Sequence, residues 1–276
     1  MQSLINQLLQ LQELVLILDE HRATGDGTHL TRLQQNVEAM AEGLPIQVKG
    51  FVQRLIKKDH IVMAPMHNGS CAMCGMRLPI SQVQAVKQAK EMQTCPSCAR
   101  ILYEPLDVAR WVGEVHSRSE PRKVGIARFS APALMIANLK ATNRNDAILE
   151  LANAMQDARF VDDAGKLVTA ALERENVLST AVENGLAFPH VRGIEGGGLT
   201  LALGTSQKGI KFDDEHSAKI IFFLAIPTAV SAFYLRLVAG LSETFLKAAN
   251  RASLLAATTQ DQLWKALVRI TRNTVK

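Results

Sequence analysis

The chain has 276 residues, of which 47% are hydrophobic and 21% are charged, and its formal net charge is +5. This composition is typical of globular proteins and excludes a disordered or collagen-like chain, while the length favours two domains. The longest apolar run, Ile220–Val230, contains Pro227 and is far shorter than the ~20 residues of a membrane span. The N-terminal sequence lacks the basic start and the small-residue cleavage site of a signal peptide. We therefore predict a cytoplasmic protein without a membrane span.

Two apolar stripes predict a helical hairpin, with the character of a short coiled coil, over residues 1–60. Their members are spaced alternately by three and four residues, as in the seam between paired helices. The stripes consist of Leu4, Leu8, Leu11, Val15 and Leu18, and of Leu30, Leu33, Val37, Met40 and Leu44. The first helix carries more apolar side chains than one seam can bury. Either a third helix over Pro45–Lys58 covers them, or the protein forms a homo-oligomer through this helix.

All four cysteines lie within residues 61–110 and predict a metal site. Cys71 and Cys74 are separated by two residues, as are Cys95 and Cys98, and 20 residues lie between the two motifs. Two such knuckles aim four sulfurs at one ion, and this spacing is typical of a four-cysteine zinc site. Because four thiolates leave no position open for water, we predict a structural Zn2+ ion rather than a catalytic one. The same ligands could also hold iron.

The cysteine segment resembles the C4-type zinc ribbon that follows a helical hairpin in a widespread bacterial family. The matching features are Asn68-Gly69 before the first pair, Met76–Pro79 after it, and Cys95–Cys98 running into Arg100–Tyr103. The hairpin here is shorter than the long coiled coil of that family, and Ala99 stands where such ribbons often have glycine. A zinc ribbon can contact nucleic acid or protein. Few aromatic residues alternate with Lys or Arg in this segment, which favours protein contact.

A polar stretch predicts a linker over residues 111–126, and residues 127–276 then alternate between helical and strand patterns. We expect helices over 143–160 and 167–176, strands over 199–204, 210–212 and 219–226, and helices over about 229–248, 251–257 and 259–273. Thr142 or Asn145 is the expected N-cap of the first of these helices. A modest sheet flanked by helices, in an α/β or α+β domain, accounts for this alternation.

One loop of this region holds groups that could handle phosphate. Pro189 fixes the chain directly before His190, and a neutral imidazole is nucleophilic near pH 7. Arg174 could balance the charge of a phosphoryl group, and the hydroxyl groups of Ser179 and Thr180 could orient its oxygens. On these residues alone, an ordinary polar loop histidine is the competing interpretation.

Residues 128–273 resemble the enzyme IIA domain of the bacterial phosphotransferase system, of the fructose, mannitol and nitrogen-regulatory type. The matching motifs are Arg174-Glu175, Ser179-Thr180, Asn184–His190, Gly209–Asp213, Ile220–Pro227 and Leu235–Leu241. The resemblance implies a type-2 IIA domain over residues 127–276, with a mixed sheet flanked by helices.

The resemblance also implies a role for each motif residue. His190 would accept a phosphoryl group from the histidine phosphocarrier protein, as a phosphohistidine carrier. Arg174 would neutralise the phosphoryl oxygens, while Ser179 and Thr180 would hold the loop or touch the phosphate. The next partner would be a cysteine of a IIB component or, in the nitrogen-regulatory branch, a regulated target protein.

Two features of the sequence qualify this implied function. All four cysteines are assigned to the metal, which favours regulation over sugar uptake. Many relatives carry a second histidine on the helix after the buried strand, near Phe233 here, and no histidine exists between residues 217 and 276. The alternative is a non-phosphorylated protein-interaction module, or a nucleic-acid-binding regulator that uses the zinc ribbon.

Overall fold

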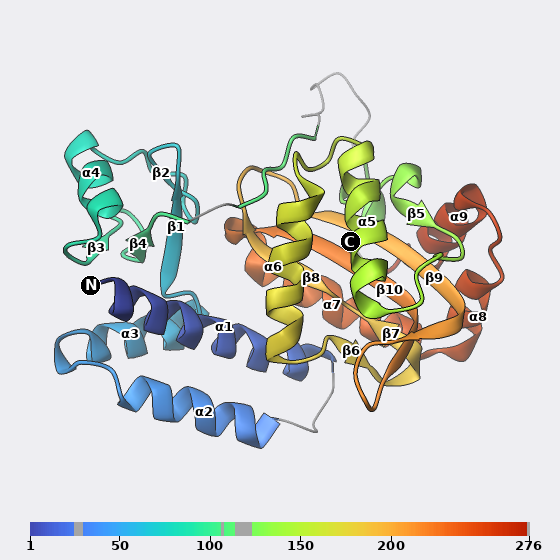
Figure 1. The fold of residues 1–276 in the computed structure, drawn as a ribbon, viewed down its shortest axis with the longest axis horizontal. Coiled ribbons are helices and arrows are strands. Elements are labelled where there is room, and N and C mark those ends of the chain that lie inside the picture. The colour runs from blue at the N-terminus through green and yellow to red at the C-terminus, as the bar shows by residue number, and fades with distance from the viewer. Residues whose placement is uncertain (25–29, 106–107, 114–122, 275–276) are drawn as a thin grey trace. The chain divides into compact units, whose positions relative to one another are not determined.

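The computed structural model describes residues 1–24, 30–105, 108–113 and 123–274 (Figure 1). They belong to two compact units, Met1–Leu106 and Asp107–Lys276. Residues 114–122 of the predicted linker lie outside the described residues. Among the described helices, none has the length and apolar character that crossing a bilayer requires.

Three helices open the first unit: α1 (Gln2–Thr24), α2 (Leu30–Glu42) and α3 (Ile46–Asp59). Leu8 and Leu11 of α1 share a buried apolar cluster with Val48 and Val52 of α3. Of the two alternatives for the extra apolar surface of the first helix, the structure thus contains the covering third helix. Self-association through this helix stays a prediction.

The ribbon follows in the same unit as a small sheet and one helix. Its elements are β1 (Met63–His67), β2 (Ser70–Cys71), α4 (Ile80–Gln88), β3 (Gln93–Thr94) and β4 (Ile101–Tyr103). The strand order is β2-β1-β4-β3, with β1 and β4 parallel. Gln12 of α1 ties the helices to this sheet, because its Oε1 accepts hydrogen bonds from the backbone N–H groups of Val62 and Met63.

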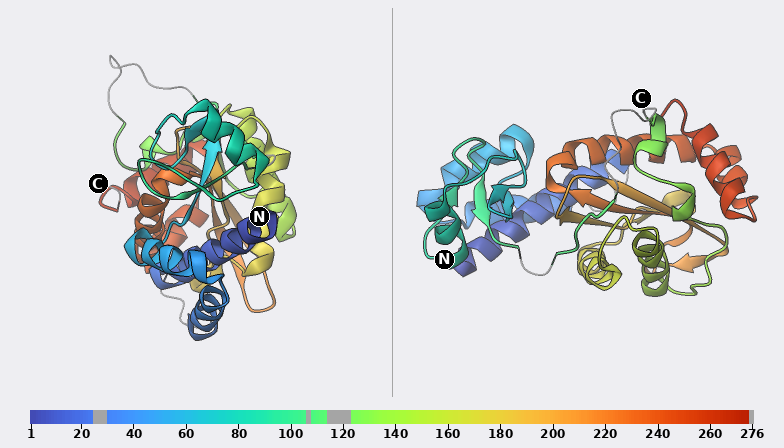
Figure 2. Two further views of the ribbon diagram at one scale, coloured as in Figure 1. Left: turned by 90° about the vertical axis from the view of Figure 1, so that its left-hand side faces the viewer. Right: turned by 90° about the horizontal axis from the view of Figure 1, so that it is seen from above.

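The second unit is a six-stranded mixed sheet between two layers of helices. Its strands are β5 (Met135–Ile136), β6 (Ala181–Val182), β7 (Leu186–Ala187), β8 (His190–Ile194), β9 (Thr200–Lys211) and β10 (Ser217–Pro227), and its α-helices are α5 (Arg144–Asp157), α6 (Ala164–Val177), α7 (Ser231–Leu246), α8 (Ala248–Leu255) and α9 (Gln260–Ile270). The order is β5-β9-β10-β7-β6, and β8 also pairs with β10. Helices α5 and α6 cover one face, and α7, α8 and α9 cover the other (Figure 2). The predicted fold class is confirmed.

Two local predictions for this unit were wrong. The N-cap of α5 is Asn143, whose side chain accepts the Asp146 N–H at 2.9 Å, rather than Thr142 or Asn145. The two strands expected over 199–204 and 210–212 are one strand, β9. A register shift in its pairing with β10 accommodates the polar residues between them.

Residues 109–112, which include the first two residues of the predicted linker, form a short extended segment within the second unit. The Trp111 N–H donates to the Glu195 carbonyl at 2.6 Å, and the Glu195 N–H donates to the Ala109 carbonyl at 3.0 Å. The Trp111 ring lies so close to Gly198 that a Cβ there would come within 2.5 Å of it. These hydrogen bonds fix Glu195, the residue directly after β8, against the segment 109–112.

Candidate functional site

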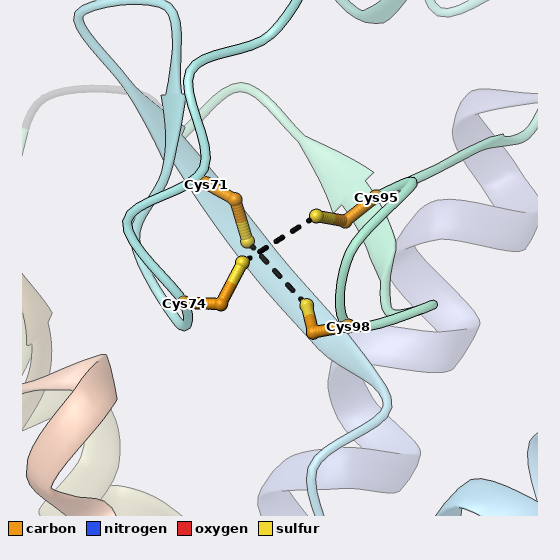
Figure 3. A group of neighbouring side chains, drawn as sticks. All are labelled: Cys71, Cys74, Cys95 and Cys98. Atoms are coloured by element: carbon orange, nitrogen blue, oxygen red, sulfur yellow. Dashed lines mark hydrogen bonds between the residues drawn. The ribbon is translucent and has the colours of Figure 1, made fainter.

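Four cysteine side chains of the first unit point toward one another (Figure 3). Their sulfur atoms all lie within 4.8 Å of one another. The Sγ–Sγ distance is 3.7 Å between Cys71 and Cys98 and 3.6 Å between Cys74 and Cys95. Sulfurs ~2.3 Å from a central zinc ion at the corners of a tetrahedron are about 3.8 Å apart. The four side chains thus fit one tetrahedral Zn2+ ion.

Both knuckles have the same backbone turn. The Gly75 N–H donates to the Cys71 carbonyl at 2.8 Å, and the Ala99 N–H donates to the Cys95 carbonyl at 2.9 Å. Gly75 has a φ of 75° and Ala99 a φ of 61°, both in the left-handed region. Glycine adopts this conformation without a steric cost, whereas alanine does not. Alanine at position 99, where such ribbons often have glycine, therefore keeps the turn but strains it.

Burial and hydrogen bonding act on the thiols in opposite directions. Burial raises the pKa of Cys71 to about 12 and also raises the pKa of Cys95. Burial also acts to raise the pKa of Cys74, but hydrogen bonds from the Met76 backbone N–H and the neighbouring thiols outweigh it and lower that pKa to about 7. Because a metal ion binds thiolates, its arrival releases protons from the more basic thiols.

The second candidate site is built around His190, the first residue of β8. Its side chain is buried, with 1% of the residue exposed. The Nδ1 atom lies 3.1 Å from the Phe188 carbonyl oxygen. A carbonyl can only accept, so in the neutral form of the imidazole the proton lies on Nδ1 and the lone pair on Nε2. The Tyr234 ring of α7 lies 5.0 Å from the imidazole, centroid to centroid.

A hairpin and a proline place His190 at this point. Strands β6 and β7 pair antiparallel around Asn184 and Gly185, with φ values of 66° and 72°. Two consecutive left-handed residues suit a tight hairpin turn. Pro189 then separates β7 from β8, and its carbonyl accepts the Leu224 N–H of β10 at 3.0 Å. His190 consequently lies opposite Leu224 in the parallel pair of β8 and β10.

The other predicted site residues come from the end of α6 and the segment after it. Thr180 donates to the buried Glu175 carboxylate from its backbone N–H at 2.8 Å and from its hydroxyl at 2.7 Å. The Thr180 carbonyl accepts the Phe188 N–H at 3.1 Å. Buried Arg174 donates to the Leu178 carbonyl at 2.8 Å. These bonds tie α6 to the segment that precedes His190.

Ser179 joins this segment to the turn between β9 and β10. Its oxygen accepts the Ala181 N–H at 3.3 Å, and its hydroxyl donates to Asp213. Burial acts to raise the pKa of Asp213, but bonds from Ser179 and from the backbone N–H groups of Glu215 and His216 outweigh burial and lower it. The hydrogen bonds of Ser179 and Thr180 are made within the protein and hold the loop in place. A contact of either residue with a phosphate stays a prediction.

Two residues at the site were missed in the sequence. Arg192 lies two positions after His190 on β8, and its guanidinium carbon is 4.7 Å from the Tyr234 ring centroid. The strand period of two could have identified Arg192 as a neighbour of His190. On α7, the resemblance puts Phe233 near the place where many relatives carry a second histidine. The centroid of the Phe233 ring, however, lies 5.0 Å from that of Phe129. Tyr234, one residue later, is the side chain that meets the imidazole.

Comparison with known proteins gives a match for each unit. Residues 129–269 match the family described as phosphoenolpyruvate-dependent sugar phosphotransferase system, EIIA 2, and residues 70–102 match the C4-type zinc ribbon domain. The fructose-specific EIIA component of the phosphotransferase system of Haloferax volcanii is 30% identical over 129 residues, which are 46% of this chain and 84% of that protein. The fructose-specific EIIABC component of Bacillus subtilis is 24% identical over 128 residues, or 46% of this chain and 20% of that protein.

Solved structures give weaker likenesses. The nitrogen regulatory protein IIA-Ntr from Neisseria meningitidis is 18% identical with a TM-score of 0.46, covering 50% of this chain and 96% of that chain. The mannitol IIA of Escherichia coli is 16% identical with a TM-score of 0.39, covering 50% and 97%. For the first unit, the ribbon match and the sulfur geometry together confirm the predicted site for one structural Zn2+ ion.

Proposed function

We propose, since the chain belongs to the EIIA 2 family of the phosphoenolpyruvate-dependent sugar phosphotransferase system, that His190 is its phosphoryl acceptor. Domains of this family transfer phosphoryl groups and interact with the histidine phosphocarrier protein and with IIB components. The observation that carries the proposal is the state of the imidazole. The Phe188 carbonyl holds the Nδ1 proton, so the Nε2 lone pair is the nucleophile.

The proposed step moves one phosphoryl group between two nitrogens. The Nε2 lone pair of His190 attacks the phosphorus of a phosphohistidine on the phosphocarrier. The donor P–N bond breaks, and its electron pair returns to the donor imidazole. Such transfers depend on positioning and on neutralising the phosphoryl charge. In this proposal Arg174 supplies positive charge, and Ser179 and Thr180 keep the loop in place.

The burial of the acceptor constrains the step. A donor phosphorus must come within about 3–3.5 Å of the attacking nitrogen. The Nε2 atom of His190 is itself buried. We therefore propose that some of the residues covering His190 move aside before transfer. The Tyr234 ring belongs to that cover, because it packs against the imidazole.

The cysteines favour a regulatory role over sugar uptake. All four cysteines in these 276 residues belong to the zinc site, so none is left to act as the phosphocysteine of a IIB component. The phosphoryl group on His190 then either passes to a IIB component on another chain or changes binding to a regulated target, as in the nitrogen-regulatory branch. We assign protein contact to the hairpin, residues 1–60, and the ribbon, residues 61–110. Exchange with a phosphocarrier would place the protein in the cytoplasm.

One reconstitution tests the acceptor role. The full chain is incubated with phosphoenolpyruvate, the general phosphotransfer enzyme and the histidine phosphocarrier protein, and its intact mass is measured. We expect the mass of one added phosphoryl group, its loss in His190→Ala, and its retention in His216→Ala. His216 is a suitable control because it is a half-exposed histidine of the same unit. A wild-type chain that gains no mass would refute the proposal.

A further inference from the structure

Arg192 and His190 share one face of β8. Side chains two residues apart on a strand point to the same side of the sheet. In the parallel pairing with β10, His190 lies opposite Leu224 and Arg192 lies opposite Ile226. Both side chains reach the same residue of α7: the Tyr234 ring centroid is 5.0 Å from the imidazole centroid and 4.7 Å from the guanidinium carbon of Arg192. The nucleophile and a permanent positive charge thus lie at one aromatic ring.

We propose that Arg192 binds the oxygens of the phosphoryl group on His190 and that Tyr234 fixes the plane of the guanidinium. This inference rests on the proposed acceptor role of His190. A guanidinium stacked over an aromatic ring uses its face for the stacking. Its N–H groups lie in the guanidinium plane and stay directed outward, where they can bind phosphoryl oxygens in pairs.

The charge balance of the site supports this role. A phosphoryl group on a buried imidazole brings negative charge into a region shielded from water, which is costly unless a cation pairs with it. Arg192 is half-buried, whereas His190 is buried. Part of the Arg192 side chain is therefore open to solvent while its Nη1 atom is buried, so a donor approaching His190 can meet this side chain, and the guanidinium can stay with the group after transfer.

The arginine implied by the resemblance is placed differently. Arg174 comes from α6, which packs on β8 from the face opposite to α7 (Figure 2). Its Nη1 donates to the Leu178 carbonyl at 2.8 Å. Arg192 is the arginine that contacts the same ring as His190. Arg192 is thus proposed to bind the phosphoryl oxygens directly, and Arg174 to supply positive charge from the end of α6.

Phosphoramidate, a small phosphoryl donor, tests the inference without the phosphocarrier. The Nε2 atom forms a bond to phosphorus, the P–N bond of phosphoramidate breaks, and ammonia leaves. We measure the rate of His190 phosphorylation by intact mass in the full chain and in Arg192→Gln, Arg192→Lys, Arg192→Ala and Arg128→Gln. Arg128 is a matched control, because its guanidinium also lies over an aromatic ring, 4.9 Å from the Phe129 centroid. Equal thermal melting curves confirm that the variants fold.

We expect Arg192→Gln to slow phosphorylation about 10- to 100-fold, less than the ~10²–10³ lost with a fully buried oxyanion donor. Arg192→Lys keeps the charge but loses the planar pair of donors, so its rate should fall between those of the wild type and Arg192→Gln. Arg128→Gln should match the wild type. Methylguanidinium at millimolar concentration should restore part of the rate in Arg192→Ala, which a purely structural role of Arg192 would not allow.

Two results would overturn the inference on its own: a wild-type rate in Arg192→Gln, or an equal loss in Arg128→Gln. The second would show a general effect of protein charge. A wild-type chain that gains a phosphoryl group from neither phosphoramidate nor the phosphocarrier would overturn the acceptor role of His190, and this inference with it.

Discussion

The buried carboxylate of Glu175 ties α6 to the segment that carries His190. It accepts two hydrogen bonds from Thr180, one from the backbone N–H and one from the hydroxyl. The Thr180 carbonyl accepts the N–H of Phe188, two residues before His190. The substitution Glu175→Ala removes both bonds to the carboxylate. It also leaves the buried Thr180 amide without its acceptor, so the second unit should lose stability.

The size of this loss follows from the two bonds. A hydrogen bond to a charged group contributes about 1.5–3 kcal/mol, so Glu175→Ala should lower the free energy of unfolding by about 3–6 kcal/mol. A unit of this length loses roughly 2–4 °C per kcal/mol, which gives a fall in Tm of roughly 6–24 °C. Glu175→Gln keeps one acceptor oxygen and should show an intermediate fall.

Calorimetry of the full chain measures the effect as a change in the Tm of the second unit, which contains both Glu175 and Thr180. Glu173→Ala is the control: Glu173 is exposed on the same helix, and such substitutions change stability by less than about 0.5 kcal/mol. A double-mutant cycle with Thr180→Val isolates the hydroxyl bond and should show a coupling of at least ~0.5 kcal/mol. Equal Tm values for Glu175→Ala and Glu173→Ala would refute the reasoning.

Three further outcomes follow from the structure. Removing zinc with a chelator should expose the ribbon to proteolysis while the second unit melts unchanged, because metal binding supplies much of the folding free energy of such modules; a protease-resistant apo-ribbon would contradict this. Diethyl pyrocarbonate should modify His216 before His190, since the His190 Nε2 is buried; peptide mass spectrometry gives the order, and equal rates would mean that the site is open. The lowered pKa of Asp213 contributes stability that is fully present above pH ~3.9 and is lost as the pH falls through the folded value; in urea unfolding the difference between the wild type and Asp213→Asn should therefore be largest at pH 7 and shrink as the pH falls below ~3.9, and a constant difference would contradict it.

The features predicted most reliably are those in which short-range spacing fixes the structure. Two residues between cysteines suffice to aim both sulfurs at one ion, so the ligands Cys71, Cys74, Cys95 and Cys98 follow from the spacing alone. The N-cap of α5 did not follow, because Thr142, Asn143 and Asn145 are all suitable residue types within four positions. Only the backbone geometry selects Asn143.

Residues brought together across the sheet were harder to predict. One residue along a helix turns the side chain by about 100°, so the shift from Phe233 to Tyr234 moves the contact from Phe129 to His190. The tie between Glu175 and Thr180 was hidden for another reason. Both residues belong to the motif, but nothing in the spacing says whether the Thr180 hydroxyl faces the Glu175 carboxylate or a phosphate.

The aromatic partner of His190 changes how the site should respond to pH. A second histidine at this place would titrate near neutral pH, whereas a phenol stays neutral and a guanidinium stays charged over that range. Tyr234 and Arg192 lie beside His190 where that histidine would stand. The substitution Tyr234→His should therefore add an inflection near neutral pH to the rate of phosphorylation by phosphoramidate, compared with the wild-type profile and corrected for ionisation of the donor. Identical pH profiles for the wild type and Tyr234→His would mean that a group at this place does not act on the transfer.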